Sequence, residues 1–296
     1  MPQLVWTAQP DGTIDYLNRR WIEYTGVDVD ELRRRSGNAG VIHPGELDET
    51  WRLWRSAVQT GEPYEQEYRI RRDSDGSYRW FLGRAVPIRS DDGTILRWIG
   101  TATDIDDQRR AHDHLRFIVE AGNSILASLD VEEICHELAR VAVQYVADWC
   151  FVTLVEDGEF RTCAIEHKNA ALRRHIEEYR DRYPPDTRSR LARVVARNET
   201  LLIEHVRPQQ LQAAAKDAEH LGLLELLKMH SVMMVPLSNP DGDVYGAVTF
   251  VSSESGRAFT ESDSSVAATV AGRAGLAIQN ARIFQRQRRA AEALRF

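Results

Sequence analysis

The 296-residue chain contains three cysteines, and their spacing limits the chemistry that their thiols could do. Cys135, Cys150 and Cys163 are odd in number and include no Cys-x-x-Cys pair. Disulfide frameworks and structural zinc sites need paired or clustered cysteines. The pattern therefore argues against both and favours a reducing, cytoplasmic location. The sequence also lacks a metal-binding carboxylate cluster and a phosphoacceptor histidine motif, so we expect no catalytic residues and no metal site in this chain.

Tryptophan is concentrated near the N-terminus, where six of the seven tryptophans lie. They are Trp6, Trp21, Trp51, Trp54, Trp80 and Trp98. Such residues can line an aromatic ligand pocket, or they can fill the core of a small domain. Core packing is the interpretation we favour. For a ligand pocket, the candidate lining residues are Trp21, Tyr24, Leu82 and Trp98.

Charge and hydropathy exclude several classes of partner. The net charge is −7 and the basic residues are dispersed, so we predict no nucleic-acid surface. No apolar run approaches the roughly 20 residues that span a bilayer. The N-terminal residues also lack the basic and apolar regions of a secretion signal. We therefore predict no membrane segment in this chain.

The first part of the chain has the pattern of a small α+β domain. Two short strands flank the turn at Pro10-Asp11-Gly12, and a longer meander turns at Asp75-Gly76 and Asp92-Gly93. The predicted strands are 4–8, 13–17, 64–72, 77–89 and 94–102, and the predicted helices are 18–25, 29–35 and 46–60.

Three separated segments of this part resemble a PAS domain: VWTAQPDGTIDYLNRRWIEYTG, VIHPGELDETWRLWRSAV and DGSYRWFLGRAVPIRSDDGTILRWIGTATDID. The resemblance implies a five-stranded antiparallel sheet with helices over one face, and a sensory or dimerisation role. Residues 1–106 contain no cysteine, which argues against a flavin-adduct light sensor. His43 is a haem-ligand candidate by residue type, but it lies in a His-Pro turn that resembles PAS domains without haem.

The second part of the chain begins with a predicted helix at 131–147, which Asp130 caps. The predicted strands are 149–155, 160–165, 200–204, 232–237 and 244–251, and the further helices are 169–182, 189–197, 208–228 and 260–296. LDVEEICHELARVAVQYVADWCFVTLV, SVMMVPLSNPDGDVYGAVTFVSS and FTESDSSVAATVAGRAGLAIQNARIF resemble a GAF domain. The resemblance implies a six-stranded antiparallel sheet with the first and last helices on one face.

Residues 165–230 match the GAF pattern only loosely, and this is where family members differ by ligand. The cyclic-nucleotide signature Asn-Lys-x-Phe-Asp-Glu is absent, and the cysteines lie outside the loop expected to bind a bilin. His205 follows a predicted strand, where a solvent-facing position is expected. The residues that could line a cavity are Phe151, Thr153, Ile165, Met233 and Met234, with core packing as the default. No cofactor is assigned.

A helix predicted from about residue 106 joins the two parts. Apolar residues alternate in steps of three and four, which gives a seam on one face as in a two-stranded coiled coil: Leu115, Ile118, Gly122, Ile125 and Leu129. The seam spans about two heptads, so packing of this helix on its own domain is the alternative. If the seam is exposed, it predicts a parallel homodimer.

The last predicted helix carries an apolar stripe of mostly small residues: Val266, Val270, Ala274, Ala277, Ala281 and Phe284. Beyond Phe284 the helix is polar, and a polar helix needs a partner or a following domain. NARIFQRQRRAAEALRF resembles the helix that leads into a metal-dependent Ser/Thr phosphatase, and it is also compatible with entry to a histidine kinase. We expect the phosphatase as the output domain, with the histidine kinase as the alternative.

The sequence thus predicts an α+β protein of two domains. The expected boundaries are 1–106 for a PAS-like domain, 107–129 for a connecting helix, 130–284 for a GAF-like domain and 285–296 for an output linker. The predicted function is signal sensing, with small-molecule binding transmitted through helices. The alternative is a ligand-free dimerisation scaffold. Ligand occupancy of purified protein distinguishes the two.

Overall fold

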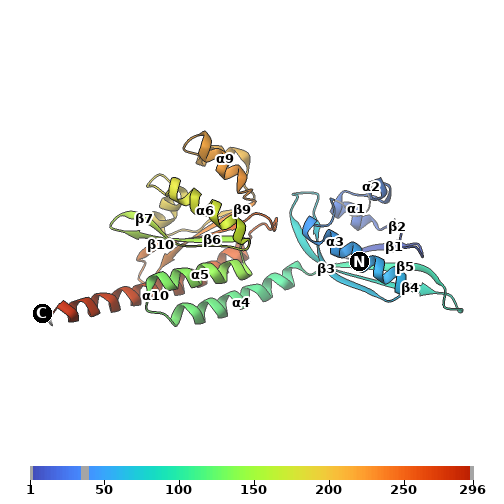
Figure 1. The fold of residues 1–296 in the computed structure, drawn as a ribbon, viewed down its shortest axis with the longest axis horizontal. Helices are drawn as coiled ribbons and strands as arrows, with labels where there is room; N and C mark the ends of the chain where they lie inside the picture. The colour runs from blue at the N-terminus through green and yellow to red at the C-terminus, as the bar shows by residue number, and fades with distance from the viewer. Residues whose placement is uncertain (1–2, 35–39, 294–296) are drawn as a thin grey trace. The chain divides into compact units, whose positions relative to one another are not determined.

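A computed structural model of the chain describes residues 3–34 and 40–293. The chain divides into two compact units, the first ending at Ala111 and the second beginning at His112 (Figure 1). In the described part of the chain, no helix has the length and apolar character that crossing a membrane requires.

Unit 1 contains a five-stranded antiparallel sheet in the order β2-β1-β5-β4-β3. The strands are β1 (Leu4–Ala8), β2 (Ile14–Leu17), β3 (Tyr64–Arg71), β4 (Tyr78–Arg89) and β5 (Ile95–Asp104). All five lie within two residues of the expected ranges, because the turns at Gly12, Gly76 and Gly93 have the positive φ that glycine adopts without strain. The predicted five-stranded sheet is confirmed.

Three helices cover one face of this sheet: α1 (Arg19–Thr25), α2 (Val29–Arg34) and α3 (Pro44–Thr60). The Asn18 side chain accepts a hydrogen bond from the Trp21 amide at the start of α1. His43 Nδ1 accepts one from the Gly45 amide at 3.1 Å, so His43 is the N-cap of α3. Arg35, the last residue of the helix expected at 29–35, lies outside the described residues.

Unit 2 also contains a five-stranded antiparallel sheet, in the order β7-β6-β10-β9-β8. The strands are β6 (Trp149–Glu156), β7 (Glu159–His167), β8 (Leu201–Ile203), β9 (Ser231–Ser238) and β10 (Val244–Ser252). The expected six-stranded sheet is therefore wrong for the described residues. Between β7 and β9 the chain forms a single three-residue strand, and its other elements there are helices.

Three helices pack on one face of the unit 2 sheet: α4 (Asp106–Leu126), α5 (Val131–Tyr145) and α10 (Glu261–Ala293). Their buried residues form one core with alternate residues of β6, β9 and β10, including Val152, Met233 and Phe250. The small residues of the predicted α10 stripe, Ala274, Ala277 and Ala281, are buried there. Residues 294–296 of the expected final helix lie outside the described part of the chain.

The other face of the unit 2 sheet lies beneath the segment between β7 and β9, which we name the cover segment (residues 168–230; Figure 1). Its helices are α6 (Ala170–Arg182), α7 (Arg190–Arg197), α8 (Pro208–Ala214) and α9 (Ala218–Leu226). The single helix predicted over 208–228 is wrong. Ala215 is extended, and the Asp217 side chain caps a new helix by accepting the His220 amide at 2.8 Å.

Helix α4 does not present the predicted seam on one face. Ile125 is fully buried in the unit 2 core, whereas Leu115 is 65% exposed, so the two lie on different faces. The buried stripe is His114, Phe117, Ala121, Gly122 and Ile125. Gly122 and Ile125 of the predicted seam are therefore buried, and Leu115 is not. Leu129 lies beyond the end of the helix. The alternative expectation, a helix packed on its own domain, describes this part of α4.

Candidate ligand-binding site

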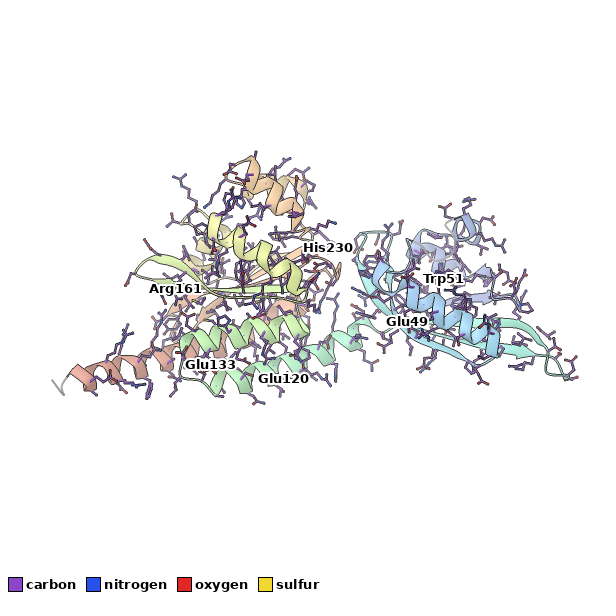
Figure 2. All side chains as sticks on the ribbon, viewed as in Figure 1. Glu49, Trp51, Glu120, Glu133, Arg161 and His230 are labelled. Carbon is purple, nitrogen blue, oxygen red and sulfur yellow. The ribbon has the colours of Figure 1, made fainter. Side chains whose placement is uncertain are left out.

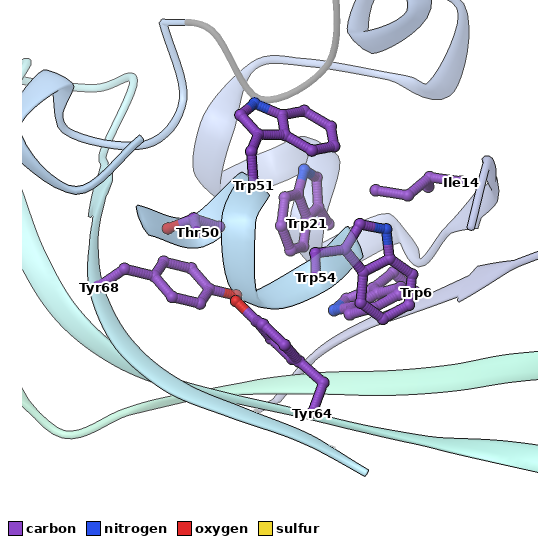
Figure 3. Close-up of a pocket in the computed structure, with 8 residues that line it drawn as sticks. All are labelled: Trp6, Ile14, Trp21, Thr50, Trp51, Trp54, Tyr64 and Tyr68. Atoms are coloured by element: carbon purple, nitrogen blue, oxygen red, sulfur yellow. The ribbon is translucent and has the colours of Figure 1, made fainter. Parts of the chain in front are cut away.

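The interior of unit 1 is filled by aromatic side chains and leaves a cavity of only about 30 Å³ (Figure 3). The indole of Trp54 lies at the centre of this aromatic cluster. It contacts three rings edge-on, at centroid distances of 5.2 Å to Trp6, 5.2 Å to Trp98 and 5.5 Å to Tyr64. Its Nε1 donates a hydrogen bond to the Gly12 carbonyl at 3.1 Å. A cavity of this size holds about one or two water molecules.

The four candidate residues of unit 1 do not converge on this cavity. Trp21 lines it. Trp98 is fully buried beside Trp54, and Tyr24 packs edge-on against Phe81 at 5.3 Å. Leu82 lies on the opposite sheet face, because strand residues alternate and the neighbouring Phe81 is in the core. Among the described residues, Trp21 Nε1, Trp98 Nε1 and the Tyr24 hydroxyl are buried without hydrogen-bond partners.

Unit 2 contains a much larger cavity, of about 720 Å³, between its sheet and the cover segment. Its floor consists of side chains on alternate positions of the strands: Trp149, Phe151, Thr162, Ile165, Ile203, Val232, Met234, Thr249 and Val251. Its walls come from α6, α7, α8 and α9 and the connections between them. Cavities of 300–1,000 Å³ with mostly apolar walls are typical of small-molecule sites.

Three of the five candidate residues of unit 2 line this cavity: Phe151, Ile165 and Met234. Met233 packs in the core on the helix-covered face of the sheet, because it alternates with Met234 along β9. Thr153 is fully buried and does not line the cavity; its hydroxyl lies 3.2 Å from that of Thr162, which does. His205 is not a lining residue either, and its ring packs edge-on against His230 at 5.5 Å.

The cavity walls carry mostly positive charge. Asp186 supplies the one carboxylate among the lining residues that the structure describes. The cavity is also lined by five cationic side chains: Arg180, Arg188, Arg190, Arg193 and Lys216. Lys216 Nζ lies 3.0 Å from the Asp186 carboxylate, and the hydrogen bond from Lys216 lowers the pKa of Asp186. Arg180 pairs with Asp181 at 2.6 Å.

His220 is a buried polar residue of the cavity wall, 4% exposed. Its ring stacks on Tyr183 at a centroid distance of 4.1 Å, and its Nδ1 accepts the Lys216 amide at 2.9 Å. Burial lowers the pKa of His220 below its ordinary value, so the ring is neutral at pH 7. The accepted hydrogen bond at Nδ1 assigns the proton of the neutral ring to Nε2.

Sequence reasoning missed six of the described residues of the cavity floor, and Thr249 is the polar one of these with a buried, unpaired hydroxyl. It is 1% exposed, and its hydroxyl has no hydrogen-bond partner among the described residues. In the sheet it pairs with Phe151 of β6 and Met234 of β9, two other lining residues. The alternation of the GAVTF segment could have placed Thr249 on this face. The cationic residues of the cover segment follow no strand alternation that could have placed them at the cavity.

The residues predicted to form a dimer or signalling helix lie in different environments. Ile118 is partly buried against the unit 2 core, and its carbonyl accepts a hydrogen bond from Arg273 of α10 at 3.3 Å. On the outer face of α4, Leu115, Val119 and Leu126 are each more than half exposed. Phe284 on α10 is 45% exposed.

Polar contacts attach α4, from His114 onward, to the other helices of unit 2. The imidazole Nε2 of His114 lies 2.7 Å from Asp263 Oδ1 of α10, and both side chains are buried. The Tyr145 hydroxyl of α5 donates to the carboxylate of Glu120 at 2.5 Å; Figure 2 labels Glu120 on α4. Together with the buried apolar stripe, these contacts attach α4 to both α5 and α10. No group of three or more metal-ligating side chains occurs in the described ranges.

Comparison with known proteins identifies the families that the two units resemble. Residues 14–102 match the PAS fold and residues 128–279 match the GAF domain. The uncharacterized protein y4lL of Sinorhizobium fredii is 41% identical over 115 residues, which are 39% of this chain and 14% of that protein. The peroxide stress-activated histidine kinase mak1 of Schizosaccharomyces pombe is 34% identical over 117 residues, 39% of this chain and 7% of the kinase. The chain thus spans a small part of the length of both relatives.

Among solved structures, the GAF domain of a phosphoenolpyruvate-protein phosphotransferase from Coxiella burnetii is 18% identical, with a TM-score of 0.46. The match covers 59% of this chain and 98% of that one. The GAF match alone extends over just more than half of the present sequence, and it contains every strand of unit 2. The chain therefore belongs to the GAF domain family, with a PAS fold before its GAF domain, and it is a sensory region of the kind found in signalling proteins.

Proposed function

We propose that this chain is the regulatory region of a longer signalling protein, in which a small molecule bound in the unit 2 cavity changes the position of α4 and α10. The observation that carries the proposal is the position of β10 between the cavity and these helices. Thr249 and Val251 line the cavity, whereas Val248 and Phe250, which alternate with them, pack in the helix-covered core. A displacement of β10 by a ligand therefore acts directly on that core.

Phe250 links β10 to α4. Its ring contacts the Phe117 ring edge-on at a centroid distance of 6.1 Å, and both side chains are fully buried. Interiors are close-packed, so a shift of Phe250 requires Phe117 to move or repack. The His114–Asp263 contact then connects α4 to the first turn of α10. This chain of contacts is a route from the cavity floor to both helices.

The first turn of α4 has its own contacts with unit 1. Asp106 Oδ1 accepts a hydrogen bond from the backbone amide of Trp80 at 3.2 Å, and Arg79 donates one to Asp107 at 2.8 Å. The Arg109 guanidinium lies 4.1 Å from the Trp80 ring centroid. Because one continuous helix carries contacts to both units, we propose that α4 transmits conformational change between them. A ligand can shift this equilibrium only if it binds the two states with different affinity.

The test compares the wild-type chain with a cavity-blocked double variant, Val232→Trp with Ala215→Trp. A control variant, Val86→Trp, adds an indole at an exposed position of unit 1. Compounds that raise the melting temperature of the wild type and the control, but not of the blocked variant, are cavity ligands. We expect such a ligand to change hydrogen–deuterium exchange in α4 and α10 as well as around the cavity. Protection confined to the cavity lining would contradict the proposed transmission.

A second candidate function, a homodimer scaffold, is favoured by the outer face of α4. Leu115, Val119 and Leu126 are exposed and spaced by four and seven residues, which is the spacing of a coiled-coil seam. Changing Leu115 and Leu126 to Glu is expected to convert a dimer to a monomer in analytical ultracentrifugation, with Val86→Glu as the control. Ile125 is unsuitable for this test because it is buried in its own domain. A wild-type monomer at micromolar concentration would contradict the dimer.

The output domain is also a proposal. The named relative with an activity in its description is a histidine kinase, so we propose a kinase output, with the phosphatase as the alternative. An in vitro autophosphorylation assay of the full-length protein distinguishes them, because a kinase incorporates phosphate from ATP.

A further inference from the structure

We infer that the ligand of the unit 2 cavity is an amphipathic organic anion: a flat apolar body with one anionic group at the cover segment and a polar substituent that reaches Thr249. This inference rests on the proposed function, since it names the class of molecule that the cavity takes. Three features of the cavity carry it: the charge of its walls, the aromatic surface of its floor, and one buried hydroxyl.

The charge of the walls favours an anion. Five cationic side chains face one carboxylate, although the whole chain has a net charge of −7. Lys216 and Arg180 already pair with Asp186 and Asp181. For Arg188 and Arg193, no ion pair occurs with any described residue. A guanidinium stays charged at every physiological pH and binds carboxylate or phosphate through paired N–H donors.

The floor favours a flat apolar body. The rings of Trp149 and Phe151 lie side by side on β6, with centroids 5.9 Å apart and planes inclined by 32°. Ile165 and Val251 extend this apolar surface onto the two neighbouring strands. Aromatic side chains of this kind offer a large contact area to a planar ligand. The opposite wall, at α7, supplies Arg190 and Arg193, so apolar and cationic surfaces lie in one cavity.

The Thr249 hydroxyl indicates a polar group on that body. Nearly all buried polar atoms in proteins have a hydrogen-bond partner, and one without a partner costs free energy. Thr249 is 1% exposed, lines the cavity, and its hydroxyl has no partner among the described residues. A hydroxyl or carbonyl group of a bound ligand would complete this hydrogen bond.

Isothermal titration of the full chain with two aromatic compounds tests the anionic group. Naphthoate and naphthamide have the same ring and shape, and only the first is charged at pH 7. We expect naphthoate to bind about tenfold more tightly, because charge-assisted hydrogen bonds are about twice as strong as neutral ones. The double variant Arg188→Gln with Arg193→Gln is expected to remove that preference while naphthamide binding stays unchanged. Arg197→Gln is the matched control, because Arg197 lies at the end of α7 and does not line the cavity.

Hydroxynaphthoate tests Thr249. We expect its added hydroxyl to tighten binding several-fold in the wild type and to have no effect in Thr249→Val, which keeps the shape and removes the hydrogen bond. Equal affinities of naphthoate and naphthamide, or no binding of either, would overturn the inferred ligand class. The proposed function would survive both results if another compound still distinguished the wild type from the cavity-blocked variant.

Discussion

The two units contain sheets with the same strand order, yet they enclose very different interiors. In each unit the first two strands form one edge, and the last strand lies between the first and the fourth. The sheet of unit 1 leaves about 30 Å³ beneath its helices, whereas the sheet of unit 2 leaves about 720 Å³ beneath the cover segment. Sheet topology therefore does not determine whether a domain of this kind has a cavity.

The difference lies in the elements that cover each sheet. In unit 1, one helix of 17 residues, α3, carries the Trp54 indole into the centre of the core. In unit 2, four shorter helices cover the sheet; α8 contains no buried residue, and α7 buries only Leu191 and Val194. The side chains of the cover segment line the walls of the space, and none of those described fills its centre as Trp54 fills that of unit 1. The size of the side chains on the covering helices decides whether a cavity remains.

The largest expected effect is that of removing the central indole of unit 1. Trp54→Ala is expected to destabilise unit 1 by about 3–5 kcal/mol, because it removes three ring contacts from a packed core and leaves a void. Phe151→Ala, which enlarges a cavity that is already open, is expected to cost about 1–2 kcal/mol. Urea unfolding followed by tryptophan fluorescence measures the first variant, since six of the seven tryptophans lie in unit 1.

Hydrogen exchange of unit 2 peptides measures the loss of stability in Phe151→Ala. This variant must leave the unfolding transition of unit 1 unchanged. Equal losses of stability in the two variants would mean that the two interiors are equally well packed, and the comparison would fail.

The second prediction compares the loss of stability when a larger side chain is introduced into each of the two interiors. Gly100 pairs with Trp6 across β5 and β1, and a Cβ at this position would overlap the Trp6 indole. Gly100→Ala is therefore expected to destabilise unit 1 by about 1–3 kcal/mol through overpacking. Val232→Phe adds more atoms but directs them into the unit 2 cavity, so it is expected to change stability by less than about 1 kcal/mol. The urea midpoints of the two variants measure this difference. A larger loss for Val232→Phe would indicate that the cavity is not free to accept a side chain.

The smallest effect concerns the pH dependence of the stability of unit 2. Burial lowers the pKa of His220 in the folded state, so below pH 6.5 the unfolded chain binds protons that the folded chain does not. This contribution to stability is present above pH 6.5 and is lost as the pH falls from 6.5 through the lowered pKa. His220→Asn retains an acceptor for the Lys216 amide and cannot titrate, so it is expected to flatten this dependence.

The measurement is the urea midpoint of unit 2 between pH 7.5 and 5, in the wild type and in His220→Asn. Burial also lowers the pKa of His167, so part of the slope should persist in the variant. An identical slope in the two proteins would show that His220 does not titrate differently on folding.

Much of the fold could be predicted from local patterns. Turns such as Asp75-Gly76 and caps such as Asn18 and Asp130 act within a few residues, and the strand ranges they predict agree with the structure to within about two residues. The failures occurred where several local solutions compete. The segment 208–228 has helical composition throughout, but the Asp217 cap divides it into two helices.

Of the candidate site, the strand residues were partly predictable and the cover residues were not. Phe151, Ile165 and Met234 lie on the cavity face, whereas Met233 packs in the helix-covered core; alternation defines two faces without saying which one is covered by which helices. Arg188 and Arg193 reach the cavity only because the chain between β7 and β9 folds back over the sheet.

The sequence by itself determined the two domains, their families and the order of helices and strands outside residues 208–228, because these depend on periodicity, turn residues and motifs that are local in the chain. Only the tertiary structure decided which face of α4 is buried and that unit 2, not the tryptophan-rich unit 1, contains the large cavity. Both outcomes depend on the fit between side chains far apart in sequence: Phe117 against Phe250 in one case, and the cover segment against β6 and β10 in the other.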